Sequence, residues 1–203
     1  MRLPSASKRY DNLIISVWNT GGGKRSFREK GMTLIDGIAA TIATRPDEPW
    51  LVVHHLDIEH LDFQQAIRDR VSMWTDVRFV HWGAHDATNE FADIPNIILA
   101  GTLFYRPSVY EARGRLASGH PSSEGKFDVK DFAQVMAGEH RHLILQALCR
   151  GAVRKCIGDA CPPCRAYIIA SSRSGIPDSL KEIFPGAQVV PWRPVKKPLK
   201  GKV

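Results

Sequence analysis

Short runs of apolar residues alternate with segments of helical periodicity along most of the chain. Continuous apolar runs bounded by turn residues are typical of strands that are buried on both faces of a sheet. The expected strands are residues 12–18, 50–55, 77–82, 96–100, 165–170 and 188–190. Helical spacing is found over residues 32–44, 60–72, 128–155 and 178–184, with a break expected near Gly138. This alternation predicts a three-layer α/β domain, with a mostly parallel sheet and helices on both faces.

In open parallel sheets, ligands bind beyond the carboxyl ends of the strands, so the segments that follow strands are candidate sites. Residues 19–26 (NTGGGKRS) follow the first expected strand. Their glycines, with Lys24 and Arg25, could bind an anion through backbone N–H groups. The segment is not a Walker A loop, because Arg25 stands where Ser or Thr must follow the lysine. The alternative interpretation is a flexible glycine turn with solvated charges.

A second candidate is the segment 83–93 (GAHDATNEFAD), between the third and fourth expected strands. Gly83 opens it, and His85, Asp86, Thr88 and Asn89 supply compact side chains that can hydrogen-bond. A plain connecting loop has a similar composition. Thr and Asn are also good N-caps, so the pair at 88–89 could instead begin a short helix.

The third candidate is a row of polar side chains on the longest expected helix. Gln146, Arg150 and Arg154 are spaced four residues apart, which would place them along one helix face. Two guanidinium groups on one ridge suit a phosphate, because they match it bidentately and stay charged. The alternative is a basic helix face that simply contacts solvent.

Together the three segments resemble the second, C-terminal RecA-like domain of superfamily two helicases and related DNA translocases. Residues 146–154 (QALCRGAVR) are similar to helicase motif VI, in which a Gln precedes two arginines that reach an ATP held by another domain. Residues 82–101 are similar to motif V, and residues 50–55 occupy the place of the motif IV strand. The resemblance covers roughly residues 10–190.

The resemblance implies a RecA-like fold over residues 12–192, between an N-terminal segment 1–11 and a basic flexible tail 193–203. It implies arginine-finger roles toward ATP for Arg150 and Arg154. The further residues that it implies are Gln146, Gly83 and Asp86 for the ATP site, and Thr88, Asn89, Lys24 and Arg25 for nucleic acid.

The chain has neither a Walker A lysine nor a DExx-type acidic box. ATP and Mg²⁺ are therefore expected to bind only with an N-terminal RecA-like ATPase domain, either in the same protein or on a separate subunit. We expect no ATPase activity from the isolated chain and no tightly bound cofactor. Two alternatives stay open: a stand-alone nucleic-acid-binding module with a degenerate helicase-like fold, and a small-molecule α/β enzyme that uses residues 83–89.

Two departures from the motif VI pattern concern its arginines. The second arginine of the family stands seven residues after the Gln, whereas Arg154 stands eight after Gln146. One residue changes the direction of a helical side chain by about 100°. Cys149 also replaces the customary glycine before the first arginine. Arg150 therefore matches the motif better than Arg154 does.

Composition adds a preference for polyanions. The net charge is +7 and the isoelectric point about 9.4, which favours DNA or RNA as a partner, although a basic surface without a partner has the same composition. No apolar stretch approaches the roughly 20 residues of a membrane span, and the first residues do not form a secretory signal. We therefore expect a cytoplasmic protein without a membrane partner.

The cysteines and histidines form patterns of low specificity. Cys156, Cys161 and Cys164 have a spacing found in some metal sites, with Cys149 as a conceivable fourth ligand. A loop of intracellular thiols is the favoured interpretation, with a metal site and a disulfide as alternatives. The pairs at 54–55 and 140/142 are interpreted as structural or solvent-exposed histidines, since no further ligand has a recognisable spacing with them.

Overall fold

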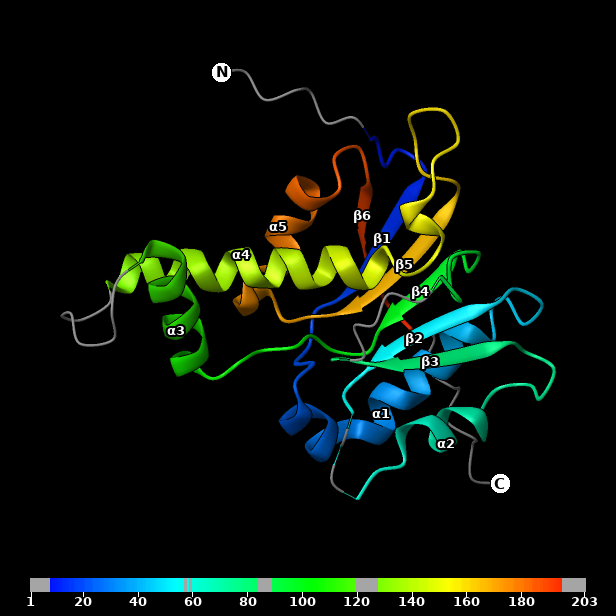
Figure 1. Ribbon diagram of the computed structural model, residues 1–203. Coiled ribbons are helices and arrows are strands. Elements are labelled where there is room, and N and C mark those ends of the chain that lie inside the picture. Colours follow the sequence, from blue (N-terminus) through cyan, green and yellow to red (C-terminus); the bar gives the residue numbers. More distant parts are fainter. Residues whose placement is uncertain (1–7, 57, 59, 84–88, 120–127, 195–203) are drawn as a thin grey trace.

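The computed structural model describes residues 8–56, 58, 60–83, 89–119 and 128–194. Its centre is one sheet, built from β1 (Leu13–Trp18), β2 (Trp50–His54), β3 (Val77–His81), β4 (Asn96–Leu99), β5 (Cys164–Ile169) and β6 (Gln188–Pro191). The six strands lie in the order β3-β2-β4-β5-β1-β6, and every neighbouring pair is parallel (Figure 1). The expected strands are thus confirmed, and the described sheet is wholly parallel.

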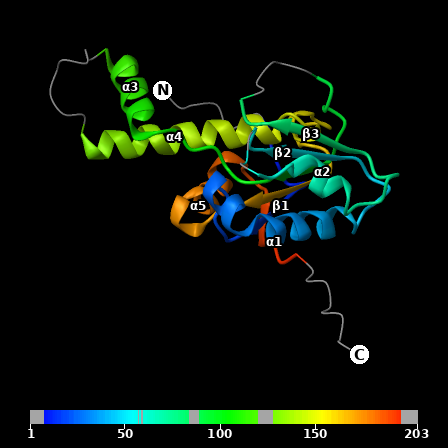
Figure 2. The ribbon, with the colours of Figure 1, turned by 90° about the horizontal axis from the view of Figure 1, so that it is seen from below.

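Helices cover both faces of this sheet (Figures 1 and 2). α1 (Lys24–Ile42) and α2 (Phe63–Arg68) pack together on one face, and α4 (Val129–Leu148) and α5 (Ile176–Ile183) pack together on the other. α3 (Pro107–Ser118) packs against α4, whose N-terminal half extends beyond the sheet in both views. The predicted three-layer α/β architecture is therefore confirmed.

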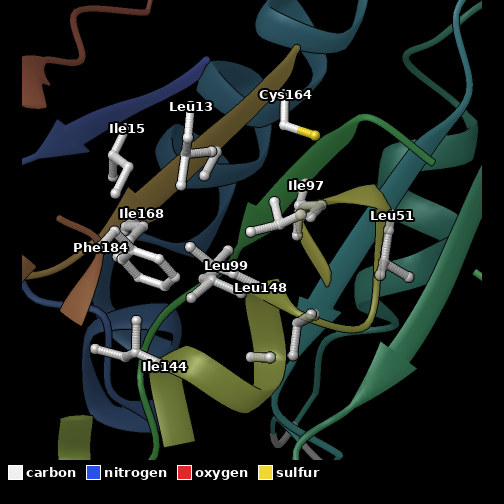
Figure 3. Packing of buried hydrophobic residues seen from close by; sticks show 14 of the residues in the cluster. Leu13, Ile15, Leu51, Ile97, Leu99, Ile144, Leu148, Cys164, Ile168 and Phe184 are labelled. Atoms are coloured by element: carbon white, nitrogen blue, oxygen red, sulfur yellow. The ribbon is translucent and has the colours of Figure 1, made fainter. Parts of the chain in front are cut away.

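Two apolar clusters, one on each face of the sheet, hold the layers together. Alternation along β2 directs Leu51 toward α4 and Trp50 toward α1. Figure 3 shows the first cluster, where Leu148 of α4 lies beside Leu99 of β4. Each fully buried side chain of this size stabilises the fold by about 1.5–3 kcal/mol relative to exposure. None of the helices in the described segments combines the length and apolar composition that a membrane span requires.

α1 begins earlier than the sequence predicts. The expected helix 32–44 corresponds to the second part of α1, which a kink at Lys30 (φ −142°, ψ 28°) separates from its first turns. Phe27 supplies the buried apolar side chain of those first turns. Lys24 and Arg25, interpreted from the sequence as part of a loop, are the first residues of this helix.

Two further boundaries differ from the prediction. α2 begins at Phe63 rather than near residue 60, because Asp62 is its N-cap and accepts a hydrogen bond from the Gln65 N–H at 3.0 Å. His60, just before it, has a positive φ of 61° that no helix continues through. α3 was not predicted at all: within it only Tyr110 and Gly114 are buried, so it lacks the apolar periodicity that indicates a helix.

The expected break of the long helix near Gly138 is wrong. α4 runs uninterrupted from Val129 to Leu148, and a side chain at position 138 would meet open space. The helix ends instead at Cys149, and residues 152–154 form a separate 3₁₀ turn, Ala152–Arg154. At Gly151 a Cβ atom would lie 2.7 Å from the carbonyl oxygen of Ile94, so the chain passes too close to the neighbouring segment for a side chain.

Candidate functional site

The loop after β1 is fixed against the carboxyl ends of the central strands. A Cβ atom on the buried Gly22 would lie 2.5 Å from the Ile169 carbonyl oxygen and 2.8 Å from the Gly101 Cα. His55, which follows β2 and is 4% exposed, donates its Nε2–H to the Gly22 carbonyl at 2.9 Å. We call Gly22, Gly101 and His55 the glycine wedge. The interpretation of this loop as a flexible turn is therefore wrong, because its middle is packed and hydrogen-bonded.

The environment of His55 favours the neutral form of its ring. Burial lowers the pKa of His55, and the nearby charge of Lys24 lowers it further, while the hydrogen bond to Gly22 opposes them. The loop is tied on its other side to the turn after β5, because the Ser172 N–H donates to Asn19 Oδ1 at 2.8 Å. The loop and three strand ends therefore form one rigid support for the start of α1.

The start of α1 offers positive charge without a counter-charge from its own first turn. Its N-cap, Gly23, provides no side-chain cap, and its first turn contains no acidic residue. Lys24 is exposed, whereas Arg25 forms an ion pair with Glu29 at 2.7 Å. Helix N-termini attract anions through their free N–H groups and the helix dipole. Of the two predicted phosphate contacts here, Lys24 is thus less committed than Arg25.

Gln146 and Arg150 meet at a different part of the same sheet edge. They line a small hollow where the ends of β2 and β3 face the last turn of α4, and its cavity volume is about 10 Å³. Its lining residues are Val53, His81, Trp82, Leu143, Gln146, Ala147 and Arg150. We call this feature the β3 hollow. Sequence segments similar to motifs V and VI thus come together in space.

The predicted ridge of Gln146, Arg150 and Arg154 does not form. α4 ends at Leu148, so Arg150 lies in the following turn and Arg154 in the 3₁₀ turn beyond it. The chain leaves the helix direction because the Ala152 N–H donates to the Ile94 carbonyl at 2.9 Å, beside the tight contact of Gly151. Arg154 is exposed and is not among the residues that line the β3 hollow. Its predicted contact with ATP stays untested.

Trp82 is a further residue that lines the β3 hollow. It is 8% exposed and belongs to the apolar cluster on the α4 face. Its indole Nε1 is buried and finds no hydrogen-bond acceptor among the described residues. The sequence signal that could have marked it is a Trp at the end of a strand directly before a glycine, here Gly83 with φ 99°.

The loop after Gly83 is described only in part. Asp86 and Thr88, predicted for the ATP site and for nucleic acid, lie outside the described residues, as does His85. Asn89 is exposed, and its carbonyl accepts a hydrogen bond from the Ala92 N–H at 3.0 Å in a turn. The described residues between it and β4 form no helix, against the alternative of a capped helix. Phe91 is buried and anchors this second half of the loop.

The cysteines are free thiols in contrasting environments. Cys161 and Cys164 are buried and Cys156 is exposed, which agrees with a loop of thiols rather than a disulfide. Burial raises the pKa of the Cys164 thiol to about 12. Within the described segments no three His, Cys, Asp or Glu side chains gather closely enough to hold a metal ion.

Two of the histidines that the sequence suggested as structural are buried and hydrogen-bonded. His54 stacks on Phe63 with ring centroids 4.9 Å apart and hydrogen-bonds the His55 carbonyl through Nδ1 at 2.7 Å. His140 Nε2 lies 2.9 Å from the Tyr110 hydroxyl in the contact between α3 and α4. Burial lowers the pKa of both rings. The structural interpretation is therefore confirmed for this pair.

Comparisons with known proteins identify the architecture. No protein-family model matches the chain, and no curated protein matches it. A solved structure described as XPD in its apo form, a superfamily two helicase, aligns with a TM-score of 0.55 and 12% sequence identity. The alignment covers 91% of this chain and 40% of that one.

The chain has a helicase-like fold. At 12% sequence identity the alignment shows similarity of fold. The three-layer parallel α/β architecture is that of a RecA-like domain. Since the chain spans only 40% of the length of the solved helicase chain, the activity and partners of a whole helicase are not transferred with the fold.

Proposed function

We propose that the chain acts as the C-terminal RecA-like half of a nucleic-acid helicase or translocase, with Arg150 completing an ATP site on another domain. The observation that carries the proposal is the meeting of Gln146 and Arg150 with the end of β3 at the β3 hollow. Motif-like segments separated in sequence by β4, α3 and most of α4 thus share one location, as an ATP-facing edge requires. The helicase-like fold supports the same interpretation.

Within this proposal the chain supplies electrostatic stabilisation rather than the phosphate-binding loop. The ATP and Mg²⁺ are held by an N-terminal RecA-like domain, in the same protein or in a separate subunit. Arg150 donates hydrogen bonds to the phosphoryl group and stabilises the charge that develops during its transfer. Gln146, one turn earlier on α4, orients the same group. Arg154 would contribute only if the 3₁₀ turn changed its position.

Nucleic acid is proposed to contact the start of α1 and the loop after β3. Lys24 offers an exposed charge beside the N-terminal N–H groups of α1, and the glycine wedge fixes its position. Asn89 is exposed on the neighbouring loop. Asp86 and Thr88 keep their predicted roles as part of the proposal, without structural support. Backbone phosphates would be bound largely by charge, so affinity would fall with salt.

The size of the β3 hollow weighs against the small-molecule enzyme. Pockets for substrates and drug-sized ligands usually measure about 300–1,000 Å³, whereas this hollow measures about 10 Å³. A group that reaches in from another molecule fits such a space better than an enclosed substrate. The two remaining candidates differ in the role of Arg150: it binds phosphate in the helicase half and has no ligand in a stand-alone nucleic-acid-binding module.

The distinguishing experiment measures two ligands with one pair of variants. The purified chain is titrated with a fluorescent single-stranded oligonucleotide by anisotropy at several salt concentrations, and with tripolyphosphate by calorimetry at low salt. We expect Lys24→Ala to weaken oligonucleotide binding and to reduce its salt slope by about one. Arg150→Ala should abolish tripolyphosphate binding and leave oligonucleotide binding nearly unchanged.

The control for both titrations is Lys130→Ala, because Lys130 is an exposed lysine near the start of α4, remote from the β3 hollow. Unchanged tripolyphosphate binding by Arg150→Ala, with intact oligonucleotide binding, would favour the stand-alone module. ATP hydrolysis by the isolated wild-type chain would contradict both.

A further inference from the structure

We infer that Trp82 is a third phosphate ligand of the β3 hollow, donating its indole N–H to the oxygen that Arg150 also binds. The inference rests on the proposed function, because it concerns the same phosphate. It goes beyond that function in assigning recognition to an aromatic residue for which the motif resemblance gives no role.

The first argument is the missing acceptor of a buried donor. Trp82 is 8% exposed, and its Nε1 is enclosed without a hydrogen-bond acceptor in the described part of the chain. Buried donors are almost always paired, since an unpaired one loses its bond to water without replacement. Tryptophan usually resolves this by reaching a partner, as Trp50 does with the Arg45 carbonyl and Trp192 with Thr41 Oγ1.

The second argument is the location of this donor. Trp82 lines the same hollow as Gln146 and Arg150, and the side chains of those two form no ion pair or hydrogen bond with another described residue. Three side chains with uncommitted donor groups therefore border one space. Arg45 provides a contrast: its Nε is also buried and unpaired, but its guanidinium lies 3.5 Å from a Glu48 carboxylate, so its charge is compensated.

The third argument is the size and polarity of the space. A volume of about 10 Å³ is roughly that of one water-sized atom, which is also the size of a single phosphate oxygen. The remaining lining is apolar, with Val53, Leu143 and Ala147. Hydrogen bonds to a charged oxygen are stronger in such surroundings than in water. A water molecule would satisfy the indole but would leave the charge of Arg150 unbalanced, so an anionic oxygen suits the set best.

The experiment follows the indole N–H directly by NMR. In a ¹H–¹⁵N spectrum the five tryptophans give separate indole signals, and comparison with Trp82→Phe assigns that of Trp82. On titration of the wild-type chain with tripolyphosphate, the Trp82 signal should move downfield and the others should not. Calorimetry should show tripolyphosphate affinity reduced about tenfold or more in Trp82→Phe, as expected for the loss of a hydrogen bond to a charged group.

The matched control is Trp74→Phe, because Trp74 is 85% exposed and does not border the hollow. If the Trp82 signal stays in place while Arg150→Ala abolishes binding, the inference is wrong and the proposed function stands. If tripolyphosphate binds the wild type and Arg150→Ala equally, both are wrong. If Trp82→Phe folds poorly, Phe variants of the other four tryptophans assign the Trp82 signal by elimination, and the wild-type titration still decides the question.

Discussion

The glycine wedge and the β3 hollow lie along the same carboxyl edge of the sheet. They differ in whether their buried hydrogen-bond donors have an acceptor. In the wedge, the His55 ring is buried and its Nε2–H is bonded to the Gly22 carbonyl. In the hollow, the Trp82 N–H is buried and has no acceptor among the described residues. A satisfied buried group stabilises the fold, whereas an unsatisfied one costs free energy.

The difference follows from what surrounds each feature. The wedge is closed by backbone: Gly22 packs between the ends of β4 and β5, where no atom larger than hydrogen fits. The hollow is bordered by side chains from the last turn of α4, which face the ends of β2 and β3. Backbone packing leaves no room for a ligand, while the meeting of a helix end with strand ends leaves a space of atomic size.

The largest expected effect is that of Gly101→Ala in the glycine wedge. Gly101 has a φ of 90°, and a Cβ there would lie 1.9 Å from the Gly22 carbonyl oxygen. The substitution therefore combines backbone strain with a steric clash, and we expect it to lower the free energy of unfolding by about 3 kcal/mol or more. Urea unfolding monitored by circular dichroism measures this. An unchanged midpoint would show that the loop can move away, and the wedge would not be rigid.

An intermediate effect concerns pH. Burial lowers the pKa of His55 from the usual value of 6.5, so the folded state binds its proton later than the unfolded state as the pH falls. The free energy of unfolding should therefore be constant above about pH 7 and decrease below pH 6.5. Each such histidine contributes up to about 1.4 kcal/mol per pH unit until its folded pKa is reached. His54 and His140 are shifted in the same direction and add to the slope.

The variant that isolates the wedge is His55→Gln. A glutamine amide can donate to the Gly22 carbonyl from a similar position but does not titrate, so the loss of stability between pH 7 and pH 5.5 should be smaller. His142→Gln is the control, because His142 is exposed on α4. Urea midpoints at several pH values measure both. An identical pH dependence in wild type and His55→Gln would mean that folding does not lower the pKa of His55.

The sequence predicted the sheet better than the helices. The central strands are apolar runs that stay recognisable because they are buried on both faces, as β2 and β4 are throughout. α3 was not predicted because only Tyr110 and Gly114 are buried within it, too few to give a helical apolar period. The end of α4 was not predicted for another reason. Gly151 packs against the Ile94 carbonyl, and a contact with a residue so distant in sequence cannot be inferred from the spacing of residues along a helix.

For the candidate site, the sequence identified the segments but not the arrangement. Gln146 and Arg150 were found by motif spacing, and they share a hollow. Arg154 was grouped with them because a continuous helix was assumed, and the 3₁₀ turn separates it. His55 fits its interpretation as a structural histidine, since its ring is buried and hydrogen-bonded. The position of Trp82 beside Gln146 and Arg150 could not be predicted, because an apolar strand end indicates packing and does not reveal the partner of the ring nitrogen.

The smallest expected effect comes from a glycine that, unlike Gly101, has open space around it. Gly138 lies in the interior of α4, where a side chain would meet open space, whereas Gly101 lies in the wedge with no room for one. Glycine costs a helix interior about 0.5–1 kcal/mol relative to alanine, so Gly138→Ala should raise the free energy of unfolding by that amount. The same urea experiment that shows destabilisation for Gly101→Ala should thus show stabilisation here. A loss of stability in Gly138→Ala would mean that α4 bends at this residue in solution, and the straight helix that carries Gln146 to the β3 hollow would have to be reconsidered.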